Sequence, residues 1–90
     1  MYTLEFAPQA LEDLARLKKY EPGAFKKARK LLAELQLHPK SGTGKPEALA
    51  GDRVGQWSRR ISQKHRLIYE IEERVVKVDV LSSYGHYNDK

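Results

Sequence analysis

The spacing of apolar residues changes twice along this chain, and this change is what most restricts its fold. Residues 2–6 alternate between polar and apolar side chains, as expected of a short strand with one buried face. Two segments then repeat apolar residues every three or four positions, as amphipathic helices do. Alternation returns near residue 56 and continues to residue 82. The pattern therefore predicts the element order β-α-α-β-β-β.

The two helices are bounded by prolines. The first is expected to begin at Pro8, because proline at the first helical position loses little by lacking an N–H. Its apolar face is predicted at three leucines: Leu11, Leu14 and Leu17. The second should begin at Pro22 and stop near residue 37, because Pro39 disfavours helical geometry in the residue before it. Its predicted buried stripe has four members: Phe25, Ala28, Leu32 and Leu35.

The rest of the chain predicts a loop and a sheet. Residues 40–55 contain four glycines and one proline, so we expect an exposed loop with one helical turn near residues 47–49. Strands should follow around 56–62, 65–72 and 75–82. The expected fold is a single α+β domain over residues 1–90, with a mainly antiparallel sheet and a two-helix hairpin packed on one face.

This arrangement assigns the charged residues of the sheet to faces. If Trp57 and Ile61 point towards the helices, Arg60 points to the open face, and Arg66 on the next strand shares that face. Arg59 falls in register with Trp57 and Ile61. The sequence leaves open whether its guanidinium reaches an edge of the sheet or pairs with a carboxylate.

Composition excludes several classes of function. The chain has no cysteine, so disulfides and thiolate-bound zinc are excluded, and neither His38 nor His65 has a second histidine at ligand spacing. We therefore expect no metal site and, without a nucleotide-binding motif, no cofactor. The absence of cysteine fits a reducing cytoplasm, and no apolar run approaches bilayer length, so we expect a cytoplasmic protein with no membrane contact. A net charge of +5 suits a polyanionic partner.

Cleavage of RNA through its own 2′-hydroxyl requires a base, an acid and positive charge near the phosphate. Glu47 is the only acidic residue in the loop before Asp52 and suits the base. Histidine, with a free pKa of about 6.5, suits the acid, and arginine suits the phosphate because its planar fork matches two oxygens. An aromatic ring such as Trp57 or Tyr87 suits stacking on an unpaired base.

Each of these residues also has an ordinary structural interpretation. Glu47 taken alone is a solvated loop carboxylate, and Trp57 is more often a core residue than a stacking platform. The Arg59 and Arg60 pair is typical of a solvated strand face or an ion pair. His38 and His65 fit surface or turn positions, and His86 fits a C-terminal tail. Composition and spacing alone therefore leave open whether this basic α+β domain acts on RNA.

Four sequence blocks carry a family resemblance. They are G-T-G-K-P-E-A-L at 42–49, W-S-R-R-I at 57–61, H-R-L-I-Y at 65–69 and G-H-Y at 85–87. In this order and spacing they resemble the YoeB/Txe family, within the RelE-like superfamily of bacterial type II toxin–antitoxin toxins. The preceding strand and helix hairpin also have the length and order of that family, so the resemblance covers nearly the whole chain.

The resemblance implies a ribosome-associated, metal-independent endoribonuclease that cleaves mRNA. It makes Glu47 the general base and Arg66 the group that stabilises the scissile phosphate. It makes His86 the general acid and Tyr87 the residue that positions the nucleotide or supports His86. Four further residues are expected to contact RNA: Lys45, Trp57, Arg59 and Arg60. The implied partners are mRNA, the ribosome, a second copy of the chain and an acidic, partly disordered antitoxin. Operator DNA is expected to be contacted only by the antitoxin.

The chain departs from the family pattern in two places. Many members carry a lysine where this chain has Ala50, so one cationic contact is either missing or supplied by Arg53. Asn88-Asp89-Lys90 extend beyond the usual end at the His-Tyr pair, next to His86 and Tyr87. Two rival functions follow. One is a catalytically weak toxin that holds the antitoxin as a co-repressor module, and the other is an RNA-binding domain without activity.

Overall fold

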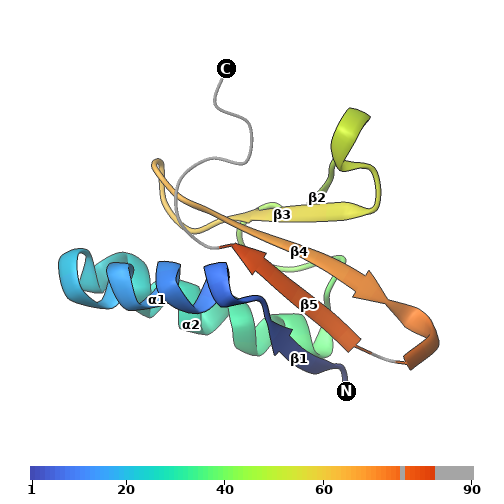
Figure 1. Ribbon diagram of the computed structural model, residues 1–90, viewed down its shortest axis with the longest axis horizontal. Coiled ribbons are helices and arrows are strands. Elements are labelled where there is room, and N and C mark those ends of the chain that lie inside the picture. Colours follow the sequence, from blue (N-terminus) through green and yellow to red (C-terminus); the bar gives the residue numbers. More distant parts are fainter. Residues whose placement is uncertain (76, 83–90) are drawn as a thin grey trace.

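The computed structural model describes residues 1–75 and 77–82, with side chains as far as Arg74 (Figure 1). Its elements are β1 (Thr3–Phe6), α1 (Pro8–Tyr20), α2 (Pro22–Leu37), β2 (Glu47–Ala48), η1 (Gly51–Arg53), β3 (Gln56–Arg60), β4 (Arg66–Glu72), η2 (Glu73–Val75) and β5 (Lys77–Ser82). The helix hairpin lies along one side of the sheet, as Figure 1 shows. The predicted α+β order and helix hairpin are confirmed.

The sheet has the strand order β1-β5-β4-β3-β2. β1 pairs with β5 in parallel, and the other three pairings are antiparallel. The predicted mainly antiparallel sheet is therefore confirmed. β1 and β5 can pair in parallel because both helices and three strands lie between them in the chain, which is long enough for a crossover connection.

The helices begin at the predicted prolines, and each buries a face shifted from the predicted one. α1 buries Ala10 and Leu17, whereas Leu11 is 56% exposed, so the prediction for Leu11 is wrong. Ala10 and Leu17 are seven positions apart and share one side of the helix, and Leu11 lies about 100° away from Ala10. On α2 the most buried residues are Ala28, Leu31 and Leu35, with Phe25 and Leu32 packed beside them.

The main core lies between the helices and the sheet. The sheet contributes Leu67 and Tyr69 to it, Ile61 joins them just after β3, and Trp57 and Ile71 pack against its rim. The opposite face also holds buried apolar residues. Ile68 is 1% exposed and Leu49 is 8% exposed, yet neither belongs to the helix-side cluster. The open face therefore has apolar positions of its own between its charged residues.

The loop between α2 and β3 differs most from the prediction. Residues 47–49 were expected to form a helical turn, but Glu47 and Ala48 form the short strand β2, which pairs with β3. A short helical segment does occur further on, at η1. Two residues are too few to show the alternation that identifies a strand, which is why the sequence pattern missed β2.

Candidate functional site

Two glycines bring the chain against the end of β3 before β2 begins. Gly42 and Gly44 have φ of 117° and 85°, a region that side chains other than glycine rarely occupy. The carbonyl oxygen of Gly44 accepts a hydrogen bond of 2.7 Å from the Arg60 N–H, and a Cβ on Gly44 would lie 2.9 Å from the Arg60 carbonyl oxygen. The loop can approach β3 this closely because Gly44 has no side chain.

β2 then places Glu47 on the open face of the sheet. Glu47 lies opposite Ser58 of β3, and Ser58 lies opposite Ile68 of β4. Residues opposed in this way project to the same face, with their Cβ atoms about 5 Å apart. Glu47 itself is exposed. A carboxylate therefore stands at the edge of a row that runs across three strands.

Two arginines occupy the next row on the same face. Arg60 lies opposite Arg66 and two residues along β3 from Ser58, so it is diagonal to Glu47. Diagonal Cβ atoms on a sheet are about 7–8 Å apart, within reach of long side chains. Arg60 is exposed and Arg66 is half-buried. The strand register thus places Glu47, Arg60 and Arg66 on one face of the sheet, on three neighbouring strands.

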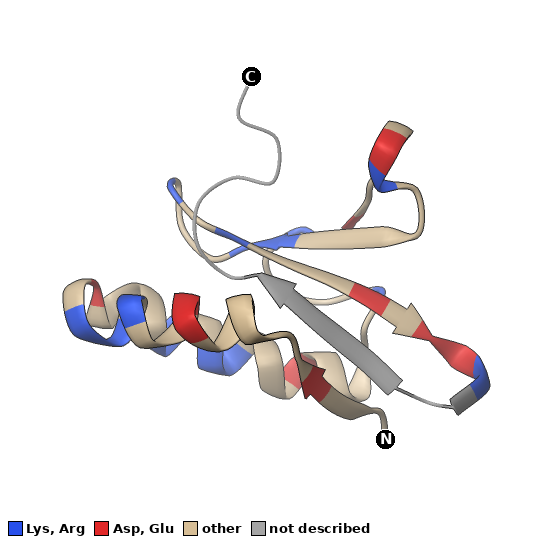
Figure 2. Cartoon of the chain, viewed as in Figure 1, with Lys and Arg blue, Asp and Glu red and all other residues tan. Residues whose placement is uncertain are grey.

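The charges on the β3–β4 hairpin are separated along its length. Figure 2 shows basic residues where β3 and β4 approach their connecting turn, and acidic residues towards the other end of β4. The acidic end includes Glu70, Glu72 and Glu73. Like charges placed directly opposite each other on a sheet are destabilising. The facing pair Arg60 and Arg66 therefore suits an anion held between their side chains.

The prediction that Arg59 binds RNA is wrong, because its side chain is completely buried on the helix side. Its Nη1 donates to Glu34 Oε1 at 2.9 Å, and its Nε donates to the Tyr69 hydroxyl at 3.2 Å. The alternative of an ion pair with a carboxylate is the one observed. Glu34 was not foreseen because it lies on α2, 25 residues away, and no local pattern links it to β3.

The remaining predicted residues are dispersed. Lys45 is exposed in the loop before β2 and has a φ of 53°, which is unusual for a residue with a side chain. Trp57 is half-buried and packs against the core, which favours its structural interpretation over base stacking. His86 and Tyr87 lie outside the described residues, so their roles stay predictions.

A buried histidine fixes the turn that precedes Arg66. His65 lies in the β3–β4 turn, one of the two positions expected of it, but it is buried rather than on the surface: it is 2% exposed, and its Nε2 lies 2.8 Å from Glu21 Oε2. The hydrogen bond to His65 is the main reason why the pKa of Glu21 is lowered. Ser62 Oγ also accepts the His65 backbone N–H at 3.2 Å. These contacts join the α1–α2 turn to the β3–β4 turn, next to Arg66.

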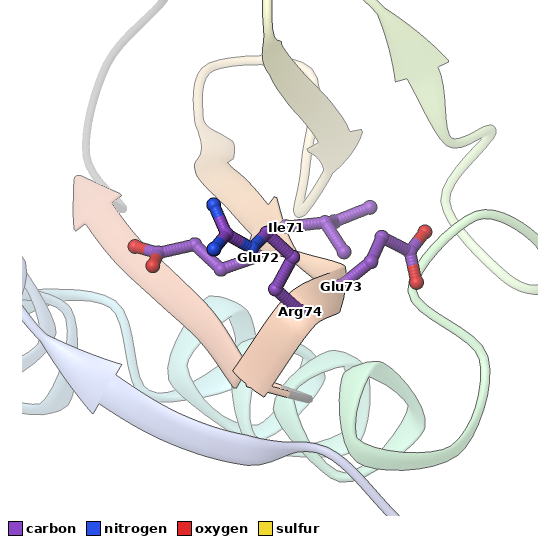
Figure 3. Close-up of a pocket in the computed structure, with 4 residues that line it drawn as sticks. All are labelled: Ile71, Glu72, Glu73 and Arg74. Carbon is purple, nitrogen blue, oxygen red and sulfur yellow. The ribbon is translucent and has the colours of Figure 1, made fainter.

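A surface hollow lies away from the arginine row, around η2. It is lined by Ile71, Glu72, Glu73 and Arg74 (Figure 3). Glu73 points away from Glu72, towards the loop after α2. There it pairs with Lys40 at 2.9 Å and accepts a hydrogen bond from the Tyr2 hydroxyl at 2.8 Å. Both contacts lower the pKa of Glu73, and the contact with Lys40 has the larger effect. The hollow contains no predicted site residue.

Among the side chains described, up to Arg74, no three histidine, aspartate or glutamate residues gather as a metal site would require. None of the helices described is both long enough and apolar enough to cross a bilayer.

Comparison with known proteins identifies the family. The family model for the YoeB-like toxin of bacterial type II toxin–antitoxin systems matches residues 6–87. This chain belongs to the YoeB family. The match spans both helices, the glycine loop and the strands that carry Glu47, Arg60 and Arg66, and it confirms the resemblance first indicated by four sequence blocks. The YoeB-family chain is accordingly the toxin of a type II toxin–antitoxin system.

Individual relatives agree with this assignment. "Toxin YoeB" of Mycobacterium bovis is 37% identical over 87 residues, which cover 97% of this chain and 100% of the relative. The YoeB/ParE toxin from Agrobacterium tumefaciens superposes with a TM-score of 0.88 at 29% identity, covering 94% of this chain and 99% of that one. Staphylococcus aureus YoeB, in a heterotetrameric complex with YefM, superposes with a TM-score of 0.81 at 32% identity, covering 97% and 99%. Its structure as a dimer gives 0.82 at 32% identity, covering 96% and 98%.

Proposed function

We propose that this toxin is an endoribonuclease that cleaves mRNA on the ribosome through the 2′-hydroxyl of the substrate. The observation that carries the proposal is the placement of Glu47 on one sheet face with Arg60 and Arg66. A carboxylate base and two phosphate-binding cations are two of the three groups that the reaction needs. The third, a general acid, is assigned to His86 by the family resemblance.

In the proposed reaction, Glu47 removes the proton from the 2′-hydroxyl, and the oxygen attacks the neighbouring phosphorus. The bond from phosphorus to the 5′ oxygen of the next nucleotide breaks as a 2′,3′-cyclic phosphate forms. His86 gives a proton to the departing 5′ oxygen, and Tyr87 positions the nucleotide or supports His86. Arg66 and Arg60 stabilise the negative charge that builds up on the non-bridging oxygens, where fixed cations lower the barrier most effectively.

The arrangement of the arginines supports these roles. Arg60 and Arg66 stand opposite each other at neighbouring strand positions, so two guanidinium forks reach one phosphate from two sides. Glu47, diagonal to Arg60, is close enough to act on the adjoining ribose. Lys45, exposed just before β2, adds a cation on the path of the RNA backbone. The proposed reaction is metal-independent, because protein side chains supply the base, the acid and the positive charge for each of its steps.

The partners follow from relatives and from charge. The S. aureus relative forms a heterotetramer with YefM and also a dimer. We infer that this chain likewise binds a cognate antitoxin, reaches operator DNA only through it, and associates with a second copy of itself. An acidic, partly disordered antitoxin segment would fold over the basic row and exclude RNA from it.

Induced expression tests the function. Wild-type protein should arrest growth and fragment mRNA, and co-expression of the antitoxin should prevent both effects. Glu47→Gln should relieve the arrest while retaining antitoxin binding, and Arg66→Gln should also relieve the arrest. Glu12→Gln, on the exposed side of α1, is the matched control and should arrest growth like the wild type. Antitoxin binding with intact mRNA after induction of the wild type would contradict the proposal and support the co-repressor alternative.

A further inference from the structure

The buried guanidinium of Arg59 makes contacts on all three of its nitrogen atoms. Nη1 donates to Glu34 Oε1 at 2.9 Å and to the Thr43 carbonyl oxygen at 3.4 Å. Nη2 donates to the carbonyl oxygens of His38 and Ser41. Nε donates to the Tyr69 hydroxyl at 3.2 Å. Burying a charge is costly unless it is paired and hydrogen-bonded, and these contacts meet that requirement.

Three of these acceptors belong to one stretch of chain. The carbonyl oxygens of His38, Ser41 and Thr43 all lie on the loop that leaves α2 and leads to β2. Tyr69 binds the same loop, because its hydroxyl donates to the Pro39 carbonyl oxygen at 2.8 Å. A loop normally runs over the surface and satisfies its carbonyls with water. Here the carbonyl oxygens accept hydrogen bonds from the side chains of Arg59 on β3 and Tyr69 on β4 instead.

The loop is also packed directly against the ion pair. A Cβ on Gly42 would lie 2.5 Å from Glu34 Oε1 and 3.3 Å from Arg59 Nη1, so only glycine fits without displacing them. Glu34 Oε1 in addition accepts the Thr43 N–H at 2.8 Å. Only Lys45 and Pro46 separate Gly44 from Glu47. Whatever fixes residues 38–44 therefore also fixes where β2 starts.

We propose that Arg59 is the positioning residue of the proposed nuclease site: its buried guanidinium holds residues 38–44 and so places Glu47 on the sheet face that carries Arg60 and Arg66. The inference rests on the proposed function. Arg59 touches no RNA and acts through the loop from the opposite face of the sheet. The alternation of β3 makes this possible, because Arg59 points into the protein and the adjacent Arg60 points to the site.

The geometry requires arginine at this position. A guanidinium has five N–H donors in a fixed plane, which suits acceptors spread around one centre. Lysine has the same charge but concentrates three donors on one nitrogen atom, so it cannot reach Glu34, Tyr69 and the loop carbonyls together. Arg59→Lys thus keeps the positive charge but loses the planar set of donors that reaches these partners together.

The test compares Arg59→Lys with Leu17→Ala, a core variant of α1 that lowers stability without touching the loop. Backbone hydrogen exchange is followed at two amides that report on the loop and β2. These are the Arg60 N–H, bound to the Gly44 oxygen, and the Leu49 N–H, bound to the Gln56 oxygen. The Glu21 N–H at the end of α1, bound to the Leu17 oxygen, is the internal reference. Cleavage of ribosome-bound mRNA is measured in parallel, with kcat and KM determined separately.

Arg59→Lys should lower the protection of the Arg60 and Leu49 amides at least tenfold relative to Glu21. It should also reduce kcat by about a hundredfold, with KM changed less than about threefold, because misplacement of a reacting group by about 1 Å costs that much. Leu17→Ala should lower protection throughout the protein and keep kcat per folded molecule within about threefold of the wild type, because its loop contacts remain. Tyr69→Phe removes one partner of Arg59 and the hydrogen bond to Pro39. Its kcat and its protection of the two loop amides should lie between those of the wild type and Arg59→Lys. This variant replaces Arg59→Lys in the test if Arg59→Lys does not fold.

Wild-type kcat in Arg59→Lys or Tyr69→Phe, or wild-type protection of both loop amides, would overturn the positioning role. A wild-type protein that cleaves no RNA would instead overturn the proposed function. In that case the exchange of the Arg60 and Leu49 amides still decides whether Arg59 fixes the loop.

Discussion

At the residue scale, the carboxylate of Glu34, which binds the loop at Thr43, makes the stability of the protein depend on pH. Hydrogen bonds from Thr43, followed by the charge of Arg59, hold the pKa of Glu34 below its ordinary value. A depressed pKa in the folded state stabilises the protein above the unfolded pKa, and this stabilisation disappears as the pH falls through the folded pKa. Glu34 therefore contributes stability at neutral pH that is lost in acid.

The first prediction follows from that sign. Between about pH 5 and pH 2, wild-type protein should lose more free energy of unfolding than Glu34→Gln, which has no proton to gain at this position. Glu21 and Glu73, whose pKa values are also lowered, contribute equally to both proteins and cancel in the comparison. Urea denaturation across this range gives both curves. Parallel curves would show that the charge of Glu34 does not stabilise the fold.

His65 and Lys64 give a second, matched comparison, since both approach the Glu21 carboxylate. His65 is buried and lies 2.8 Å from it, whereas Lys64 is exposed and lies 3.8 Å away. His65→Ala should lower the free energy of unfolding by about 1–3 kcal/mol, because it leaves a cavity and removes a partly buried hydrogen bond. Lys64→Ala should change it by less than about 0.5 kcal/mol, as exposed ion pairs do. Equal losses in thermal or urea unfolding would contradict this assignment.

The sequence placed individual residues well where alternation decides the face. Arg60 and Arg66 were assigned to one face, and the strand register confirms it. Arg59 could not be assigned in the same way, because its burial depends on Glu34 and on loop carbonyls that become neighbours only when α2 packs on the sheet. The burial of His65 was missed for the same reason, since its partner Glu21 is 44 residues away.

At the element scale, the loop before β2 depends on Gly44. Gly44→Ala would place a Cβ 2.9 Å from the Arg60 carbonyl oxygen at a φ of 85°. It should lower the free energy of unfolding by about 1–3 kcal/mol and reduce RNA cleavage, because β2 must shift. Gly23→Ala is the control, with nothing within 4 Å of its Cβ and a position inside α2. It should be neutral or stabilising by up to about 1 kcal/mol. Denaturation and cleavage assays measure both, and a harmless Gly44→Ala would refute the close approach.

Element prediction from sequence succeeded where a pattern was long. Both helices began at the expected prolines, and the three later strands were found within two residues of their bounds. The buried faces of the helices differ from the predicted ones because each helix has more apolar residues than its contact with the sheet can bury. On α1, Ala10 rather than Leu11 is buried. β2 was missed because a two-residue strand exists only through its pairing with β3.

At the scale of the whole molecule, the separation of charge along the β3–β4 hairpin should be visible in RNA binding. Each phosphate contact adds about one unit to the slope of log affinity against log salt concentration. Arg60→Gln, at the basic end, should reduce this slope by about one. Arg74→Gln, beside Glu72 and Glu73 at the acidic end, should leave it unchanged. Titrations of single-stranded RNA between 50 and about 200 mM salt provide the slopes. A loss of the same size in both variants would contradict the assigned RNA face.

The central claim is that Glu47, with Arg60 and Arg66, cleaves RNA through the 2′-hydroxyl of the substrate. The most direct measurement uses one mRNA on the ribosome in two forms, which differ only in a 2′-deoxy nucleotide at the mapped cleavage site. Wild-type protein should cut the ribose form to a 2′,3′-cyclic phosphate and leave the deoxy form intact, and Glu47→Gln should cut neither. Cleavage of the deoxy form at that site, or full activity in Glu47→Gln, would contradict the account.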